Sequence, residues 1–71
     1  MVNVLGSGEP RDARLVGITD ALADPLAHLH VYAKQRVFER RKMGHLTVAG
    51  ASSTVEALQR ARAAVAQLRW A

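Results

Sequence analysis

Lys34 and Arg41 are the two residues whose types and spacing best suit a chemical task, which is the binding of a phosphate group. A flexible ammonium and a planar guanidinium that converge on one phosphate can both donate charge-assisted hydrogen bonds to its oxygens. We call these two residues the phosphate clamp. Polar and apolar residues alternate around both, with the period of two that is typical of half-buried strands. Lys34 shares its side of the alternation with His28, His30 and Tyr32, and Arg41 shares its side with Met43, His45 and Thr47.

The alternation predicts a β-hairpin with one buried face and one polar face. Its expected strands are 28–34 and 43–48, joined by a basic loop over 35–42. If the apolar faces of the two strands align, both clamp cations emerge on the polar side near the loop. The alternative is that the loop charges are only solvated, and this is the interpretation we adopt for Arg36 and Arg40.

The three histidines raise the alternative of a metal site. His28 and His30 lie two residues apart on one strand face, and His45 can face them across the hairpin. No Asp, Glu or Cys stands at ligand spacing beside them, and histidines in such positions more often make ordinary hydrogen bonds. We therefore expect no metal site.

The chain lacks the motifs of an independent enzyme. It has no nucleophile beside a base and no convergent pair of carboxylates. Its one glycine cluster, residues 6–8, is too short to cradle a phosphate and does not open a helix. We expect the chain alone to have no catalytic activity.

The net charge of +4 suits the phosphates of either a small ligand or a nucleic acid. A nucleic-acid module interleaves basic residues with exposed aromatic ones, or presents a helix to a groove. The three aromatic residues, Tyr32, Phe38 and Trp70, are dispersed, and the arginines of the C-terminal segment show no groove-reading pattern. A small basic module that binds nucleic acid or a protein remains the alternative outside the enzymes.

The elements that position the clamp predict a small α+β unit, an antiparallel sheet with a C-terminal amphipathic helix. Before the hairpin we expect a strand over 1–5 that ends at the turn 6–8, a surface loop over 9–14, and a short helix over 19–27. Thr19 or Asp20 is expected to cap this helix, and Pro25 to end or kink it.

A longer helix is expected from Ser53 to about Arg69. Ser53 and Glu56 fit a capping box, in which the hydroxyl serves the amide of Glu56 and the carboxylate reaches back to the amide of Ser53. The spacing predicts a buried face of Val55, Leu58, Ala61, Val65 and Leu68, and an outer face of Glu56, Gln59, Arg60, Ala63 and Gln67.

The size of the chain limits it to one domain. Its 71 residues are 49% hydrophobic and contain no cysteine, so a small core has no disulfide or zinc-thiolate support. We therefore expect a subdomain of a larger protein or an obligate oligomer, with a homodimer left open. No apolar run reaches the ~18 residues of a membrane span and no signal peptide is readable, so a cytoplasmic protein without membrane partners is expected.

Three segments, MVNVLG, HLHVYAK and RRKMGHLTVAG, resemble the C-terminal end of the N5-carboxyaminoimidazole ribonucleotide synthetase family. These are ATP-grasp enzymes of purine biosynthesis, also described as the ATPase subunit of phosphoribosylaminoimidazole carboxylase. The resemblance covers nearly the whole chain, although residues 6–27 match only loosely. Its most specific part is Tyr32-x-Lys34 followed by Arg41-Lys42-Met43-Gly44-His45.

The resemblance implies a reaction in which ATP hydrolysis drives carboxylation of aminoimidazole ribonucleotide by bicarbonate, through carboxyphosphate. It implies that Lys34 and Arg41 hold the 5′-phosphate of the ribonucleotide, supported by Tyr32, Lys42 and His45. The family often has Arg-Pro-Gly where this chain has Phe38-Glu39-Arg40, so a third phosphate contact lacks its cation here.

The resemblance also implies a small subdomain, similar to a rudimentary hybrid motif, that packs beside the ATP-grasp domain of the same enzyme. The ATP-binding domains are absent from residues 1–71, so ATP and Mg²⁺ are expected in the full-length enzyme and neither on this chain alone. Related ATP-grasp enzymes, such as biotin carboxylase and the formate-dependent glycinamide ribonucleotide transformylase, are the nearest alternatives.

Overall fold

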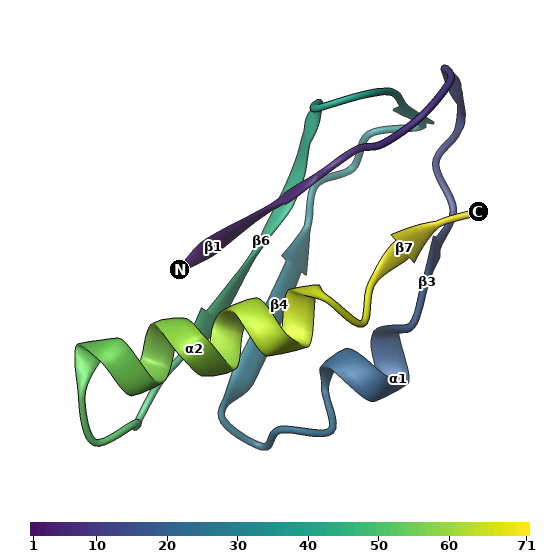
Figure 1. Ribbon diagram of the computed structural model, residues 1–71. Helices are drawn as coiled ribbons and strands as arrows, with labels where there is room; N and C mark the ends of the chain where they lie inside the picture. Colours follow the sequence, from purple (N-terminus) through teal and green to yellow (C-terminus); the bar gives the residue numbers. More distant parts are fainter.

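The computed structural model describes all residues 1–71 and is built around a three-stranded antiparallel sheet (Figure 1). The long strand β6 (Lys42–Val48) lies in the middle, between β1 (Val2–Leu5) and β4 (Ala27–Val31). Helix α2 (Thr54–Val65) crosses one face of the sheet, and the short helix α1 (Ile18–Ala21) packs beside α2. This arrangement confirms the predicted α+β class.

The pairing of β4 with β6 agrees with the predicted hairpin and its parity. Leu29 lies opposite Leu46, and His30 lies opposite His45. Successive side chains of a strand point to opposite faces, so the leucines face α2 while the histidines lie on the open face of the sheet. The alternation in the sequence therefore predicted which side chains share a face, although β4 ends at Val31 and not at residue 34 as predicted.

Leu46 is at the centre of the core. Its side chain is 0% exposed and clusters with three small buried residues from the two helices, Ala21, Ala61 and Ala64. Six partly buried apolar side chains pack against this cluster: Val2, Ala27, Leu29, Val48, Val65 and Leu68. Alanines on the inner face let the helices approach the sheet closely.

The beginning of α2 follows the predicted capping box with one change. Ser53 is the N-cap in an extended conformation, and its hydroxyl accepts a hydrogen bond from the Glu56 amide at 3.0 Å. The Glu56 carboxylate accepts from the amide of Ser52 at 2.9 Å and from the Ser52 hydroxyl, instead of reaching the Ser53 amide. The carboxylate thus satisfies an amide one residue earlier than predicted.

The predicted buried face of α2 is confirmed for Ala61, which is buried, and for Val65 and Leu68, which pack against the core, but it is wrong for Val55 and Leu58. Ala61 and Ala64 are buried, whereas Val55 and Leu58 are 67% and 37% exposed. The helix turns Ala61 and Ala64 toward Leu46, and these three residues belong to one buried cluster. It ends at Val65 and not near Arg69, since the chain must leave the helix to form a further strand.

Helix α1 is shorter than predicted and begins earlier. It is one turn long, and its N-cap is Gly17 in the left-handed conformation, with φ of 89°, so neither Thr19 nor Asp20 is the cap. Asp24 then forms a turn by accepting from the Leu26 amide at 2.9 Å, which releases the chain into β4. Neither helix of the molecule has the length and apolar character that a membrane span requires.

Two short ladders lie outside the central sheet and were not predicted. In one, β2 (Arg11–Asp12) pairs with β5 (Arg36–Val37), so both expected loops contain a strand. In the other, β3 (Leu15–Val16) pairs with β7 (Arg69–Trp70). Strands of two residues are too short to show alternation in the sequence.

Arg11 connects segments that are far apart in the chain. Its guanidinium donates to the carbonyl oxygens of Ser7 and Glu9 at 2.7 and 2.8 Å, and to those of Trp70 and Ala71 at 3.1 and 2.6 Å. One charged side chain therefore joins the turn after β1 to the strand β7.

Candidate phosphate-binding site

Lys34 and Arg41 lie at the same end of the hairpin, just beyond the paired strands. Pairing continues past β4, because the Tyr32 amide donates to the Met43 carbonyl oxygen at 2.8 Å. The Lys34 ammonium donates to the carbonyl oxygen of Lys42, the residue that follows Arg41. The turn therefore brings the lysine beside the backbone that carries the arginine.

The Arg41 side chain is held by two contacts. Its Nη1 donates to the Arg36 carbonyl oxygen at 2.9 Å. Its guanidinium carbon lies 5.0 Å from the centroid of the Phe38 ring, within the range of a cation–π contact. The Arg36 carbonyl belongs to β5, and Phe38 directly follows that strand.

No carboxylate neutralises Lys34, Arg41 or Lys42. The ion pairs of the molecule are Arg36 with Asp12 and Arg60 with Asp24 and Glu56. A lysine has three N–H donors and an arginine has five, and each clamp residue uses one of them on a backbone carbonyl. Both cations therefore keep donors for an external anion.

The two other loop arginines differ from each other. Arg40 is exposed, as expected, and has φ of 65°, the left-handed conformation that non-glycine residues seldom adopt. Arg36 remains 55% exposed but pairs with Asp12 at 3.0 Å, which the sequence interpretation of simple solvation did not include. The partner comes from β2, which joins β5 in the short ladder.

Three rings gather on the open face of the sheet and end at Lys34. His30 and His45 stack with centroids 5.1 Å apart and ring planes 2° apart. The Tyr32 hydroxyl lies 3.0 Å from His45 Nδ1, and the Lys34 ammonium lies 5.6 Å from the centroid of the Tyr32 ring. Tyr32 and His45, named above as supporting residues, are thus connected to the lysine side of the clamp.

The histidines do not form a cluster of metal ligands. Across the sheet His30 faces His45, while His28 lies opposite Thr47. No group of three or more His, Cys, Asp or Glu side chains gathers in the molecule in a way that could hold a metal ion. The observed partner of the half-buried His45 is the Tyr32 hydroxyl.

The glycine turn after β1 packs against the turn that carries Arg41. The Gly6 amide donates to the Arg41 carbonyl oxygen at 2.7 Å, and the Arg40 amide donates to the Gly6 carbonyl oxygen at 2.8 Å. The Gly8 amide donates to a Glu39 carboxylate oxygen at 2.6 Å. Sequence reasoning missed this role of Glu39, although a single acid in a basic loop is a signal for such a contact.

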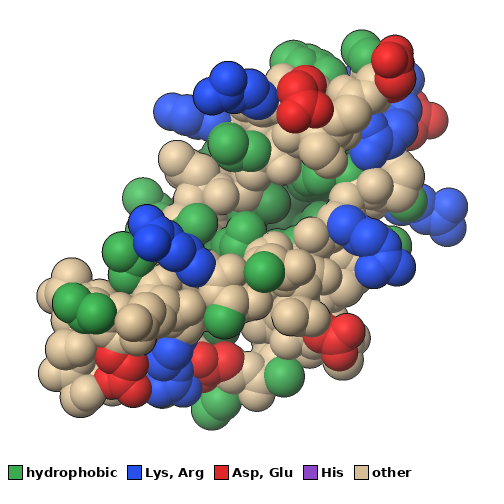
Figure 2. Space-filling model, in the orientation of Figure 1, with side chains coloured by type: hydrophobic (Ala, Val, Ile, Leu, Met, Phe, Trp, Pro, Cys, Tyr) green, Lys and Arg blue, Asp and Glu red, His purple; other side chains and the backbone are tan.

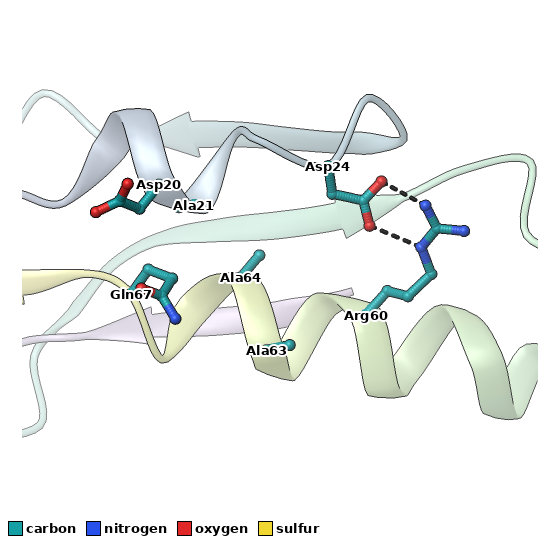
Figure 3. Close-up of a pocket in the computed structure, with 7 residues that line it drawn as sticks. All are labelled: Asp20, Ala21, Asp24, Arg60, Ala63, Ala64 and Gln67. Atoms are coloured by element: carbon teal, nitrogen blue, oxygen red, sulfur yellow. Dashed lines mark hydrogen bonds and ion pairs between the residues drawn. The ribbon is translucent and has the colours of Figure 1, made fainter.

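A depression of about 260 Å³ lies between α1 and α2, away from the clamp (Figure 3). On its rim Arg60 donates two hydrogen bonds to Asp24, from Nε at 2.7 Å and from Nη2 at 2.6 Å. Arg60 also lies 3.5 Å from a Glu56 oxygen, so it is half-buried between two acids and not on a free outer face as predicted. The pair joins α2 to the turn before β4.

The Asp24–Arg60 pair predicts a loss of stability in acid. The hydrogen bonds from Arg60, followed by that from the Leu26 amide, hold the pKa of Asp24 below its usual value of 3.8. A carboxyl with a lowered pKa in the folded state stabilises above its unfolded pKa, and this contribution is lost as pH falls below about 4. We expect the Asp24→Asn variant to be less stable at neutral pH and to lose part of the acid dependence.

Urea denaturation at about pH 7 and about pH 3 measures this difference. Asp20→Asn is the matched control, because Asp20 is exposed on the same depression and has no ion pair. Equal pH dependence in the wild type and the Asp24→Asn variant contradicts the prediction.

The fold is similar to that of a domain found within a larger synthetase. The chain matches the crystal structure of N5-carboxyaminoimidazole ribonucleotide synthetase from Thermotoga maritima with a TM-score of 0.85 and 37% sequence identity. The match covers 97% of this chain and 19% of that one. The family model described as phosphoribosylaminoimidazole carboxylase C-terminal domain matches residues 1–60. The chain belongs to this family, which confirms the family resemblance of the sequence.

A curated relative extends the comparison to a second enzyme. The chain is 33% identical over 66 residues to the formate-dependent phosphoribosylglycinamide formyltransferase of Dechloromonas aromatica (strain RCB). The alignment covers 93% of this chain and 16% of the relative. The chain therefore spans about a sixth of the curated relative and about a fifth of the solved structure.

Proposed function

We propose that this chain is the C-terminal domain of a cytoplasmic ATP-grasp ligase that carboxylates aminoimidazole ribonucleotide in purine biosynthesis. In this proposal Lys34 and Arg41 bind the 5′-phosphate of the ribonucleotide, with Tyr32, Lys42 and His45 in support. The observation that carries the proposal is the pair of cations at one hairpin end without a carboxylate partner, in a chain of this family.

The charges of the hairpin end support a dianionic ligand. A carboxylate beside either clamp cation would compete with a phosphate, and the nearby acids are otherwise engaged, since Asp12 pairs with Arg36 and Glu39 accepts from the Gly8 amide. A charge-assisted hydrogen bond contributes about 1.5 to 3 kcal/mol. Two such contacts are a substantial share of the binding free energy of a small substrate.

The proposal assigns ATP and Mg²⁺ to other domains of the same polypeptide. ATP supplies the phosphoryl group that activates bicarbonate, and no group of side chains on this chain fits a metal ion. The surface supports a neighbouring domain, because several large apolar side chains are over 40% exposed (Figure 2). They are Met1, Leu5, Ile18, Leu22, Val31, Phe38 and Val55.

The size of the natural polypeptide tests the domain assignment directly. An antiserum raised against residues 1–71 should detect, in cells that express the gene, a protein about five to six times the length of this chain. A product no longer than this chain overturns the assignment to a ligase. The measurement is an immunoblot with the purified chain as a size standard.

Removal of either clamp cation should weaken ribonucleotide binding. In the full-length ligase we expect Lys34→Ala and Arg41→Ala each to raise the KM for aminoimidazole ribonucleotide roughly 10- to 100-fold, because each loses one charge-assisted contact. The KM for ATP should not change. Initial rates at saturating ATP and bicarbonate measure the effect.

Arg62→Ala is the control for these variants, because Arg62 is an exposed cation of α2 with no ion pair. This variant should leave the KM for the ribonucleotide and the KM for ATP unchanged. An unaltered ribonucleotide KM in both clamp variants contradicts the assignment of Lys34 and Arg41.

The curated relative favours one second candidate, a formate-dependent glycinamide ribonucleotide formyltransferase. Both candidate substrates carry a ribose phosphate, so the clamp serves either. Product analysis with each ribonucleotide separates them. Consumption of aminoimidazole ribonucleotide with bicarbonate supports the first proposal, and consumption of glycinamide ribonucleotide with formate supports the second.

A further inference from the structure

We propose that Phe38 is a positioning residue for Arg41, an inference that rests on the phosphate-binding function proposed above. The guanidinium carbon of Arg41 lies 5.0 Å from the Phe38 ring centroid. The ring holds the guanidinium over the hairpin end before the ribonucleotide arrives. At this position, where the resembling family often has a cation, the chain therefore supplies an orienting surface.

The Phe38 ring restricts the Arg41 guanidinium in a way that its single hydrogen bond does not. Arg41 Nη1 donates to the Arg36 carbonyl oxygen at 2.9 Å, and one hydrogen bond still allows the guanidinium plane to rotate about that contact. A ring against the planar group limits this rotation. Because a long side chain loses rotamer freedom when it binds, a guanidinium that is already oriented loses less on binding the phosphate.

The turn fixes Phe38 through its backbone and leaves the ring outside the core. The Arg41 amide donates to the Phe38 carbonyl oxygen at 3.1 Å, which closes the turn over Arg40 with its left-handed backbone. A Cβ added at Gly6 would lie 2.2 Å from the same Phe38 oxygen, so the glycine turn packs tightly against it. The Phe38 side chain is 42% exposed, and therefore contributes little to the folded core.

The other clamp cation has a parallel arrangement. The Lys34 ammonium is tethered to a backbone carbonyl and lies 5.6 Å from the Tyr32 ring centroid. The Tyr32 hydroxyl is in turn within hydrogen-bond distance of His45. Each clamp cation thus has one carbonyl tether and one ring.

Substitution of Phe38 in the full-length ligase tests the inference. Exposed cation–π contacts contribute about 0.5 to 1 kcal/mol, so Phe38→Leu should raise the KM for the ribonucleotide about two- to five-fold. The kcat and the KM for ATP should not change. Phe38→Trp keeps a ring with a stronger cation–π contact and should preserve the wild-type KM or lower it.

Leu58→Ala is the matched control, since Leu58 is 37% exposed and lies on α2, outside the hairpin that carries the clamp. It should leave the KM unchanged. Circular dichroism of each variant checks that the fold is retained. An unchanged KM in Phe38→Leu, or an equal rise in Phe38→Trp, overturns the inference.

A double-mutant cycle shows whether Phe38 acts through Arg41. In the Arg41→Ala background, Phe38→Leu should cause no further rise in the ribonucleotide KM. A further rise of the same size in that background overturns the positioning role. The proposed function is judged separately by Arg41→Ala and Lys34→Ala: a rise there with none for Phe38→Leu rejects only the inference, and no rise there rejects the function itself.

Discussion

Replacement of Leu46 by alanine should lower the free energy of unfolding by about 2 to 5 kcal/mol. Leu46 is 0% exposed and lies on the central strand, where it faces Val2 on one side and Leu29 on the other. Buried alanines from the two helices pack against Leu46. Their side chains are too short to fill the cavity that the substitution creates.

This loss is large relative to the total folding stability of the chain. At roughly 0.05 to 0.15 kcal/mol per residue, a domain of this size has a total stability of about 4 to 10 kcal/mol. Urea denaturation followed by circular dichroism measures the change. Val55→Ala is the control, because Val55 is 67% exposed and its truncation should change stability by about 0.5 kcal/mol or less. Similar losses in the two variants contradict the assigned core.

Substitution of Gly17 by alanine should be comparably damaging. Gly17 has φ of 89°, and a Cβ there would lie 1.9 Å from the carbonyl oxygen of Gln67. The backbone conformation costs about 1 to 3 kcal/mol for a residue with a side chain. To relieve the clash, the segment between α2 and β7 must move, which lowers the free energy of unfolding by about a further 1 to 3 kcal/mol.

Gly50→Ala measures the backbone cost by itself, so the difference between the two variants gives the steric part. Gly50 has nearly the same φ, 85°, but the nearest atom to an added Cβ is Leu26 Cδ2 at 3.6 Å, an ordinary contact. Gly50→Ala should therefore show only the backbone cost. Thermal denaturation followed by the fluorescence of Trp70, the single tryptophan, compares the two variants. Equal losses show that the close approach of Gly17 to Gln67 does not matter.

The part of the fold that could be predicted from the sequence is the part with a long repeating pattern. Alternation over seven residues of one strand and six of the next predicted the two faces of the hairpin, and the pairs Leu29–Leu46 and His30–His45 agree with those faces. Ser53 was correctly predicted as the N-cap, because a serine just before a helical apolar pattern, with a glutamate three residues later, is typical of a helix start. Both features depend on neighbours within a few positions in the chain.

The rest depends on contacts between distant segments. The predicted helix ran to about Arg69, yet Arg69 and Trp70 lie outside the helix and pair with Val16 and Leu15 of β3. The helical spacing placed Val55 and Leu58 inside together with Ala61, whereas in the structure Ala61 and Ala64 are buried and Val55 and Leu58 are exposed. Tertiary fit decided these cases against local preference.

The candidate site divides in the same way. Parity in two strands identified Lys34 and Arg41 as the pair at the hairpin end, and whether they bind phosphate stays a prediction. Contacts of Arg41 with the Phe38 ring could not be foreseen, because they depend on a turn in which Arg40 adopts a conformation that arginine seldom takes. A glycine there would have signalled the turn.

The long-range tethers of this chain determine when it can fold during synthesis. Strand β1 has no partner until Lys42–Val48 has left the ribosome, and the carbonyls that Arg11 holds in Trp70 and Ala71 emerge about sixty residues after it. Contacts of such sequence separation form slowly, since a long loop must close first. The apolar face of the central sheet therefore stays uncovered until α2 (Thr54–Val65) has also left the exit tunnel, and the Arg11 contacts form only after Trp70 and Ala71 have followed. During this interval the nascent chain is most exposed to aggregation and to chaperone binding.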